Sequence, residues 1–232
     1  MSIISHGASA RMSEIRTVLF DLDGTLADTA PDLGFALNAL LRESGRPPVP
    51  YASIRPEASH GARALLRLGF GVQPQDATYG NLRQRFLDLY AQNLCRETRL
   101  FPGVSELLTT LQVRGLNWGI VTNKPGFLTQ PLVSALGLAA DAACVVSGDS
   151  TANAKPHPEP LLHACALAGS TPSACLYVGD AARDIEAGRL AGMRTLVAMF
   201  GYIGAQDVPD DWGADALVAS PAAILEWIDA GH

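Results

Sequence analysis

The hydrophobic positions of the chain form short continuous apolar runs that alternate with stretches of helical periodicity. Because the runs lack strict alternation of apolar and polar residues, they are typical of central strands covered on both faces. Strands and helices that alternate at this spacing predict right-handed crossovers and a parallel sheet with helices on both sides. The predicted strands are 17–20, 117–122, 143–147, 174–179, 195–199 and 215–219, and the predicted helices are 103–114, 126–136, 158–168, 182–191 and 221–230.

One interval interrupts this alternation. Between Pro31 and about Leu100 the pattern shows no convincing strand and predicts only helices, at 31–44, 62–69 and 79–95. A helical block placed after the first strand predicts an inserted cap. The expected fold is α/β: a Rossmann-like parallel sheet with helices on both faces, plus an inserted all-helical cap. We expect a core of residues 13–30 and 101–232, a cap of residues 31–100 and a flexible tail of residues 1–12.

Charge differs between these two parts. Residues 31–102 carry nine Arg, no Lys and six acids, a net of +3, while the rest carries −9, within a total of −6. An acidic core beside an arginine-bearing cap indicates a metal ion in the core and an anionic substrate held by the cap. The net negative charge argues against a nucleic-acid surface.

Composition adds limits on location. The chain has 232 residues, of which 48% are hydrophobic and 17% charged, an ordinary globular balance. No apolar run approaches the roughly 20 residues of a membrane span, and the first residues lack the apolar stretch of a signal peptide. The four cysteines have neither metal-ligand nor redox spacing. We therefore expect a cytoplasmic protein with reduced thiols and no membrane or nucleic-acid partner.

Residues that can carry chemistry follow four of the predicted strands. In an open parallel sheet, ligands gather at the carboxyl ends of the strands. An isolated Asp after a strand is often only a helix cap, and an isolated Lys can be a solvated loop charge. Four such strand ends together are not explained in this way. They supply Asp21, Asp23, Gly24 and Thr25, then Thr122, Asn123 and Lys124, then Lys155, and finally "GDAARD" (179–184).

The spacing of the carboxylates predicts a metal site. Asp21 and Asp23 lie at i and i+2 of an extended segment, so both can point to one side. Two such charges at the end of a buried strand repel each other, which indicates a cation between them. With Asp180 from another strand end, they form an oxygen-rich site that suits Mg²⁺. There is no His or Cys cluster for zinc, and no glycine-rich nucleotide motif.

The same residues suit phosphoryl transfer. Lys155, Thr122 and backbone amides could neutralise a phosphoryl group from one side while Mg²⁺ does so from the other. A carboxylate placed there can attack phosphorus and form an aspartyl-phosphate. The second Asp can protonate the leaving alkoxide and later deprotonate a water.

These segments resemble the four motifs of the haloacid dehalogenase superfamily. "DLDGTLAD" is similar to the first motif, "VTNK" to the second, the Lys of "AKPHPEP" to the third and "GDAARD" to the fourth, over about residues 14 to 230. The cap resembles that of phosphoglycolate phosphatases and β-phosphoglucomutases. The resemblance implies an Mg²⁺-dependent phosphatase.

It also implies roles for single residues. Asp21 would be the nucleophile and Asp23 the general acid/base, Thr122 and Asn123 would hold the phosphoryl group, and Lys155 would balance its charge. Asp180 would bind Mg²⁺ beside Asp21 and the Asp23 carbonyl, with Asp184 ordering that shell. Thr25 and Lys124 are further candidates for substrate binding.

Four longer segments resemble the N-acetylmuramic acid 6-phosphate phosphatases of peptidoglycan recycling, although His157 stands where such sequences often carry Asp. A small acidic phosphorylated metabolite of that kind is the expected substrate, and phosphoglycolate is the alternative. A phosphomutase remains possible because it keeps both aspartates, whereas a dehalogenase lacks the second and a binding module would have lost catalytic groups. We expect a monomer or a weak homodimer. The segments are 59–66, 116–125, 155–165 and 201–215.

The cap segment "SHGARALL" (59–66) predicts an anion site. Ser59 is a plausible N-cap and Gly61 allows close backbone approach at the start of an apolar helix. Arg63, with His60, would bind the carboxylate of the substrate. The alternative is that Arg63 is a surface residue paired with Glu57.

Overall fold

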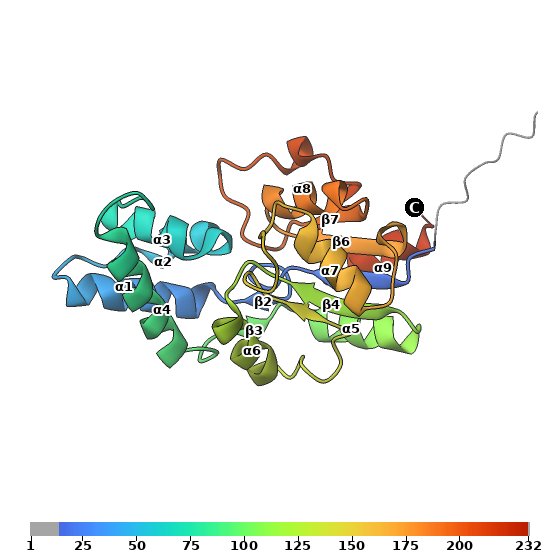
Figure 1. Cartoon of the computed structure of the whole chain (residues 1–232), viewed down its shortest axis with the longest axis horizontal. Helices are drawn as coiled ribbons and strands as arrows, with labels where there is room; N and C mark the ends of the chain where they lie inside the picture. Colours follow the sequence, from blue (N-terminus) through green and yellow to red (C-terminus); the bar gives the residue numbers. More distant parts are fainter. Residues whose placement is uncertain (1–13, 232) are drawn as a thin grey trace, which may run out of the picture.

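A computed structural model describes residues 14–231, which form a six-stranded sheet and a group of helices beside it (Figure 1). The sheet has the order β5-β4-β1-β6-β7-β8, and every neighbouring pair is parallel. The predicted fold class is confirmed. The tail predicted at residues 1–12 lies outside the described residues. The strands are β1 (Thr17–Phe20), β4 (Asn117–Val121), β5 (Val145–Val146), β6 (Cys175–Gly179), β7 (Arg194–Ala198) and β8 (Ala216–Val218).

The helices of the sheet region cover both of its faces because alternate residues of each strand point to opposite sides. In β1, Val18 and Phe20 pack in one buried cluster with residues of α5, α6 and α9, whereas Leu19 packs in a second cluster with residues of α7 and α8. None of the helices in the described part of the chain is both long and apolar enough to span a bilayer. The bounds are α5 (Val104–Val113), α6 (Gly126–Ala135), α7 (Glu159–Leu167), α8 (Ala182–Leu190) and α9 (Pro221–Asp229).

The register of the central strands positions the site. Phe20, the last residue of β1, is paired with Ile120 of β4 and with Val178 of β6. The backbone N–H of Asp21 then donates to the Val178 carbonyl at 2.9 Å. The residues that follow β1, β4 and β6 therefore leave the sheet side by side at one edge.

The part of the chain assigned to the cap lies beside the sheet and is largely helical (Figure 1). Its helix α4 ends at Gln92, earlier than expected, and Cys95 beyond it has a positive φ of 61°. Two elements were not predicted, the short helix α2 and the 3₁₀ turn over Arg55–His60 that follows it. Both are too short to produce a periodic pattern. The helices are α1 (Ala30–Glu43), α2 (Tyr51–Ile54), α3 (Gly61–Phe70) and α4 (Tyr79–Gln92).

The chain enters and leaves this helical part through a two-stranded antiparallel sheet. β2 (Ala27–Asp28) pairs with β3 (Arg99–Leu100), so the expectation of no strand up to Leu100 is wrong at its last two residues. Strands of two residues are too short to show an alternating pattern. Next to this pair, the buried Asp32 carboxylate accepts hydrogen bonds from Thr98 N at 2.9 Å and Thr98 Oγ1 at 2.7 Å.

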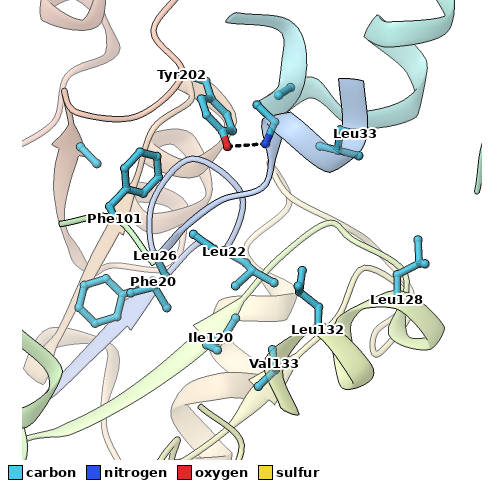
Figure 2. Packing of buried hydrophobic residues seen from close by; sticks show 14 of the residues in the cluster. Phe20, Leu22, Leu26, Leu33, Phe101, Ile120, Leu128, Leu132, Val133 and Tyr202 are labelled. Atoms are coloured by element: carbon cyan, nitrogen blue, oxygen red, sulfur yellow. Dashed lines mark hydrogen bonds between the residues drawn. The ribbon is translucent and has the colours of Figure 1, made fainter. Parts of the chain in front are cut away.

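The hydrophobic core continues from the sheet into the helical part. Figure 2 shows Leu33 of α1 in one cluster with Leu22, which follows β1, and with Leu128 of α6. In the same view, Tyr202 accepts a hydrogen bond from the backbone N–H of Ala30 at 2.9 Å. The start of α1 is thus fixed to the core by apolar packing and by this bond. The division of the chain into two domains at residues 31–100 stays a prediction.

Candidate active site

A buried lysine lies at the centre of the strand ends. Lys155 Nζ is 2.9 Å from Asp21 Oδ1 and 2.8 Å from Asp184 Oδ1, and the lysine side chain is fully buried. It also donates to the Val121 carbonyl at 2.8 Å and to the Tyr177 hydroxyl at 2.6 Å. The ammonium is therefore held between two carboxylates, as a cation must be where water is excluded.

Three buried carboxylates come together around this point. Asp21, Asp180 and Asp184 each place one oxygen within 4.8 Å of the others. Burial, followed by the charges of Asp21 and Asp184, raises the pKa of Asp180 to about 7. Burial also raises the pKa of Asp21, although Lys155 opposes it. At Asp184 burial is the largest single effect and would raise the pKa, but the charges of Lys155 and Arg183 and the hydrogen bonds to the carboxylate together outweigh it, so the pKa is lowered.

This donor set fits a divalent cation. Two cations, Lys155 and Arg183, do not balance three carboxylates, and oxygen donors at this spacing are those that hard cations prefer. The acid at position 23 takes a different place. The Asp23 carboxylate lies 3.0 Å from Lys124 Nζ and accepts from Thr29 Oγ1 at 2.5 Å. The structure therefore brings together three of the four predicted metal carboxylates. The fourth, the Asp23 carboxylate, points toward Lys124 instead.

The loop after β4 is joined to the loop that carries Lys155. The Asn123 side chain donates to the Lys155 carbonyl at 2.8 Å and accepts from its backbone N–H at 3.0 Å. The Thr122 hydroxyl is buried and accepts from Lys124 N at 3.2 Å. The Asn123 amide thus holds the two loops in place, and both residues line the cavity described next.

A cavity of about 650 Å³ lies between the strand ends and the cap. Catalytic candidates from the core form one wall, and His60, Gly61 and Arg63 are among the cap residues that form the other. Thr25 is not brought to this cavity: it is buried, and its hydroxyl has no hydrogen-bonding partner within the described residues. The core residues that line it are Asp21, Asp23, Thr122, Asn123, Lys124, Pro125, Leu128, Lys155, Pro156 and Arg183.

The start of α3 differs from the expectation. Ser59 is not the N-cap: His60 occupies that position, and no side chain caps the helix. The Ser59 hydroxyl instead donates to Asp180 Oδ1 at 2.7 Å, because the tight turn brings this part of the cap onto the core. The suggested pair of Glu57 with Arg63 is also wrong, since Glu57 pairs with Arg67 at 3.1 Å.

Two residues of the site were missed from the sequence. Arg183, inside "GDAARD", donates to the Ser59 carbonyl at 2.7 Å, approaches His60 Nδ1 at 3.0 Å and lies 3.9 Å from Asp21 Oδ2. Tyr90 of α4 reaches Lys124 with its hydroxyl at 3.2 Å. Arg183 could have been predicted as a site residue, because it lies three residues after Asp180 in a motif that follows a strand. Nothing in the sequence around Tyr90 indicates that it belongs to the site.

Comparison with known proteins agrees with this geometry. A family model of haloacid dehalogenase-like hydrolases matches residues 15–192. The N-acetylmuramic acid 6-phosphate phosphatase of Pseudomonas putida is 43% identical over 216 residues, which cover 93% of this chain and 97% of that protein. The phosphoglycolate phosphatase of Xanthomonas campestris pv. campestris is 44% identical over 211 residues, which cover 91% and 95%. A crystal structure of a predicted phosphoglycolate phosphatase from Haemophilus somnus has a TM-score of 0.81 at 29% identity, covering 93% and 99%.

The chain belongs to the haloacid dehalogenase-like hydrolase family. The enzyme class predicted within this family, a phosphoric monoester hydrolase, is confirmed by its phosphatase relatives.

Gly24, in the loop after β1, has no room for a side chain. Its φ is +87°, and an added Cβ would lie 1.9 Å from Asp180 Oδ2 and 2.7 Å from the Tyr202 ring. Gly24→Ala should displace Asp180 and lower phosphatase activity at least about a hundredfold, as a misplacement of about 1 Å can. The measurement is kcat/KM on p-nitrophenyl phosphate.

Gly45→Ala is the matched control. Gly45 also has a positive φ, +67°, but no atom lies within 4 Å of the added Cβ. It should lose about 1 kcal/mol of stability from backbone strain and keep its activity. Equal loss of activity in both variants would show that strain, and not overlap with Asp180, is the cause.

Proposed function

We propose that this protein hydrolyses the phosphomonoester of an acidic amino sugar, N-acetylmuramic acid 6-phosphate, through an aspartyl-phosphate on Asp21 and with Mg²⁺ as cofactor. One observation carries the chemistry: Asp21 lines the cavity, lies 2.9 Å from the Lys155 ammonium and shares a cluster with the carboxylates of Asp180 and Asp184. This arrangement suits a nucleophile that must accept a highly charged group.

In the first step an oxygen of Asp21 attacks phosphorus. The P–O bond to the sugar breaks, its electron pair stays on the leaving oxygen, and Asp23 gives that oxygen a proton. In the second step Asp23 takes a proton from a water, whose oxygen attacks phosphorus. The bond from phosphorus to Asp21 breaks, so inorganic phosphate leaves and the Asp21 carboxylate returns.

Lys155 supplies positive charge near the attacking oxygen throughout, and Asn123 keeps the lysine loop in position. Asp21 and Asp180 would hold Mg²⁺, with Asp184 beside them. When bound, the ion would neutralise the charge of the phosphoryl group and of the carboxylates.

The size and charge of the cavity support N-acetylmuramic acid 6-phosphate as the substrate. Its volume of about 650 Å³ is that of a pocket for a drug-sized ligand, far more than a two-carbon acid requires. Arg63, Arg67 and Arg83 line the cap side, where they can bind the lactyl carboxylate of the sugar. Leu33, Phe86 and Leu87 supply apolar surface for its acetyl and methyl groups.

Phosphoglycolate is the second candidate, because relatives with that name are as similar to this chain as those named for the sugar phosphate. Both compounds carry a carboxylate, so the arginines do not separate them. A phosphomutase also keeps both aspartates and remains the third candidate. A cytoplasmic location and a monomeric or weakly dimeric state are part of the proposal.

The nucleophile is tested with Asp21→Asn, which keeps the shape of the side chain but removes its charge. Turnover should fall by about four orders of magnitude or more. Mass spectrometry of acid-quenched protein should find a phosphorylated peptide around Asp21 in the wild type alone. Near-normal turnover of this variant would exclude the covalent mechanism, and Asp141→Asn, at an exposed position, is the control.

The cation is tested by thermal unfolding, which does not depend on turnover. Mg²⁺ at 100 times its Kd should stabilise the protein by about 2.7 kcal/mol. Asp180→Asn should remove most of this increment, because it takes one of the three carboxylates away. An unchanged increment in Asp180→Asn would show that Mg²⁺ binds elsewhere. Chelator should abolish activity of the wild type.

The substrate is tested with Arg63→Ala. Loss of a charge-assisted contact costs about 2–4 kcal/mol, so kcat/KM for N-acetylmuramic acid 6-phosphate should fall about a hundredfold. Hydrolysis of p-nitrophenyl phosphate, which has no carboxylate, should hardly change. Arg85→Ala is the control, since Arg85 is a half-exposed cap residue that does not line the cavity.

The wild type should also prefer the sugar phosphate to phosphoglycolate in a phosphate-release assay. The reverse preference would select the second candidate. Equal losses on both test substrates in Arg63→Ala would indicate damage to the fold instead of a lost contact.

A further inference from the structure

Lys124 is buried against the acid/base residue and does not extend into the cavity as a free cation. Its side chain is 6% exposed, and Nζ lies 3.0 Å from Asp23 Oδ1. On its other side, Nζ donates to the Tyr90 hydroxyl at 3.2 Å and lies 4.6 Å from the centre of the Tyr90 ring. Burial alone would lower the pKa of Lys124, but Asp23 and Tyr90 outweigh it and raise that pKa.

Two donors fix one oxygen of Asp23. Thr29 Oγ1 and Lys124 Nζ both contact Oδ1, and neither contact involves Oδ2. When Asp23 is protonated, Oδ1 serves as the acceptor for both donors, so the proton belongs on Oδ2. Asp23 lines the cavity, and this pattern leaves Oδ2 to face the leaving group.

Tyr90 belongs to the cap. It lies on α4, is fully buried, and also lines the cavity. Lys124, in contrast, belongs to the loop between β4 and α6. The chain Tyr90–Lys124–Asp23 therefore runs from a cap helix to the acid/base of the core.

We propose that Lys124 and the cap residue Tyr90 are positioning residues for Asp23, which hold its Oδ1 so that Oδ2 delivers the proton to the leaving oxygen. This inference rests on the proposed function, because it requires Asp23 to act as the general acid. It replaces the role of substrate binding that the sequence suggested for Lys124. The proton moves from Oδ2 to the leaving oxygen as the P–O bond breaks.

The test compares leaving groups. p-Nitrophenyl phosphate releases a stabilised phenolate that needs no proton, whereas N-acetylmuramic acid 6-phosphate and phosphoglycolate release alkoxides that do. Lys124→Met should lower kcat/KM for the alkyl phosphates about a hundredfold, within the range of general acid catalysis. For the aryl phosphate, kcat/KM should fall less than about threefold, since this parameter covers only the steps up to loss of the leaving group, and that leaving group needs little general acid catalysis.

Tyr90→Phe keeps the ring and removes only the hydroxyl. It should lower kcat for the alkyl phosphates about tenfold, as expected for one lost hydrogen bond to a charged group, with KM unchanged. Tyr51→Phe is the control, because Tyr51 is an exposed cap tyrosine outside the cavity lining. Thermal unfolding of each variant checks the fold.

The outcomes separate the proposals. A rise in KM for both kinds of substrate, with kcat kept, would make Lys124 a substrate-binding residue and overturn this inference alone. Equal losses of kcat/KM on both kinds would also overturn it, since in the step that expels the leaving group a positioned acid affects only the poor leaving groups. A wild type inactive on every phosphate would overturn the proposed function itself.

Discussion

The buried ammonium of Lys155 between Asp21 and Asp184 is the interaction on which the site depends. Both carboxylates are almost without solvent, so removing the cation would leave charges that the protein interior cannot compensate. The sheet makes this possible because β1 is its central strand and has β4 and β6 as neighbours. Groups from β4, β6, α8 and the loop after β1 thus converge on a single cation.

The cap takes part in the same electrostatic arrangement. Ser59 donates to Asp180, and Arg183 of the core donates back to the Ser59 carbonyl. On the other side of the site, Tyr90 contacts Lys124. The cap residues and the strand-end residues around the cavity are therefore joined by hydrogen bonds, although they come from separate parts of the chain.

Much of the fold and the identity of the site residues could be predicted from the sequence. Apolar runs identify the strands, and the carboxyl ends of parallel strands meet at one edge, which brings Asp21, Thr122 and Asp180 together. The partners of each side chain could not be predicted, because they depend on tertiary contacts. Ser59 has the character of an N-cap, but it lies inside the 3₁₀ turn over Arg55–His60, and its hydroxyl donates to the Asp180 carboxylate. Lys124 turns toward Asp23 and Tyr90 for a similar reason.

The antiparallel pair of β2 and β3 has a consequence for how this enzyme could diversify. Because the chain leaves the core at Ala27–Asp28 and returns beside it at Arg99–Leu100, the ends of the intervening segment are adjacent. A segment with adjacent ends can be lengthened, shortened or exchanged without altering the register of the six-stranded sheet. Any replacement that still provides an aromatic hydroxyl for Lys124 and a serine for Asp180 would keep the hydrogen bonds that this segment makes to the strand ends. Evolutionary changes in this segment could therefore alter the cap side of the cavity while the residues at the strand ends stay the same.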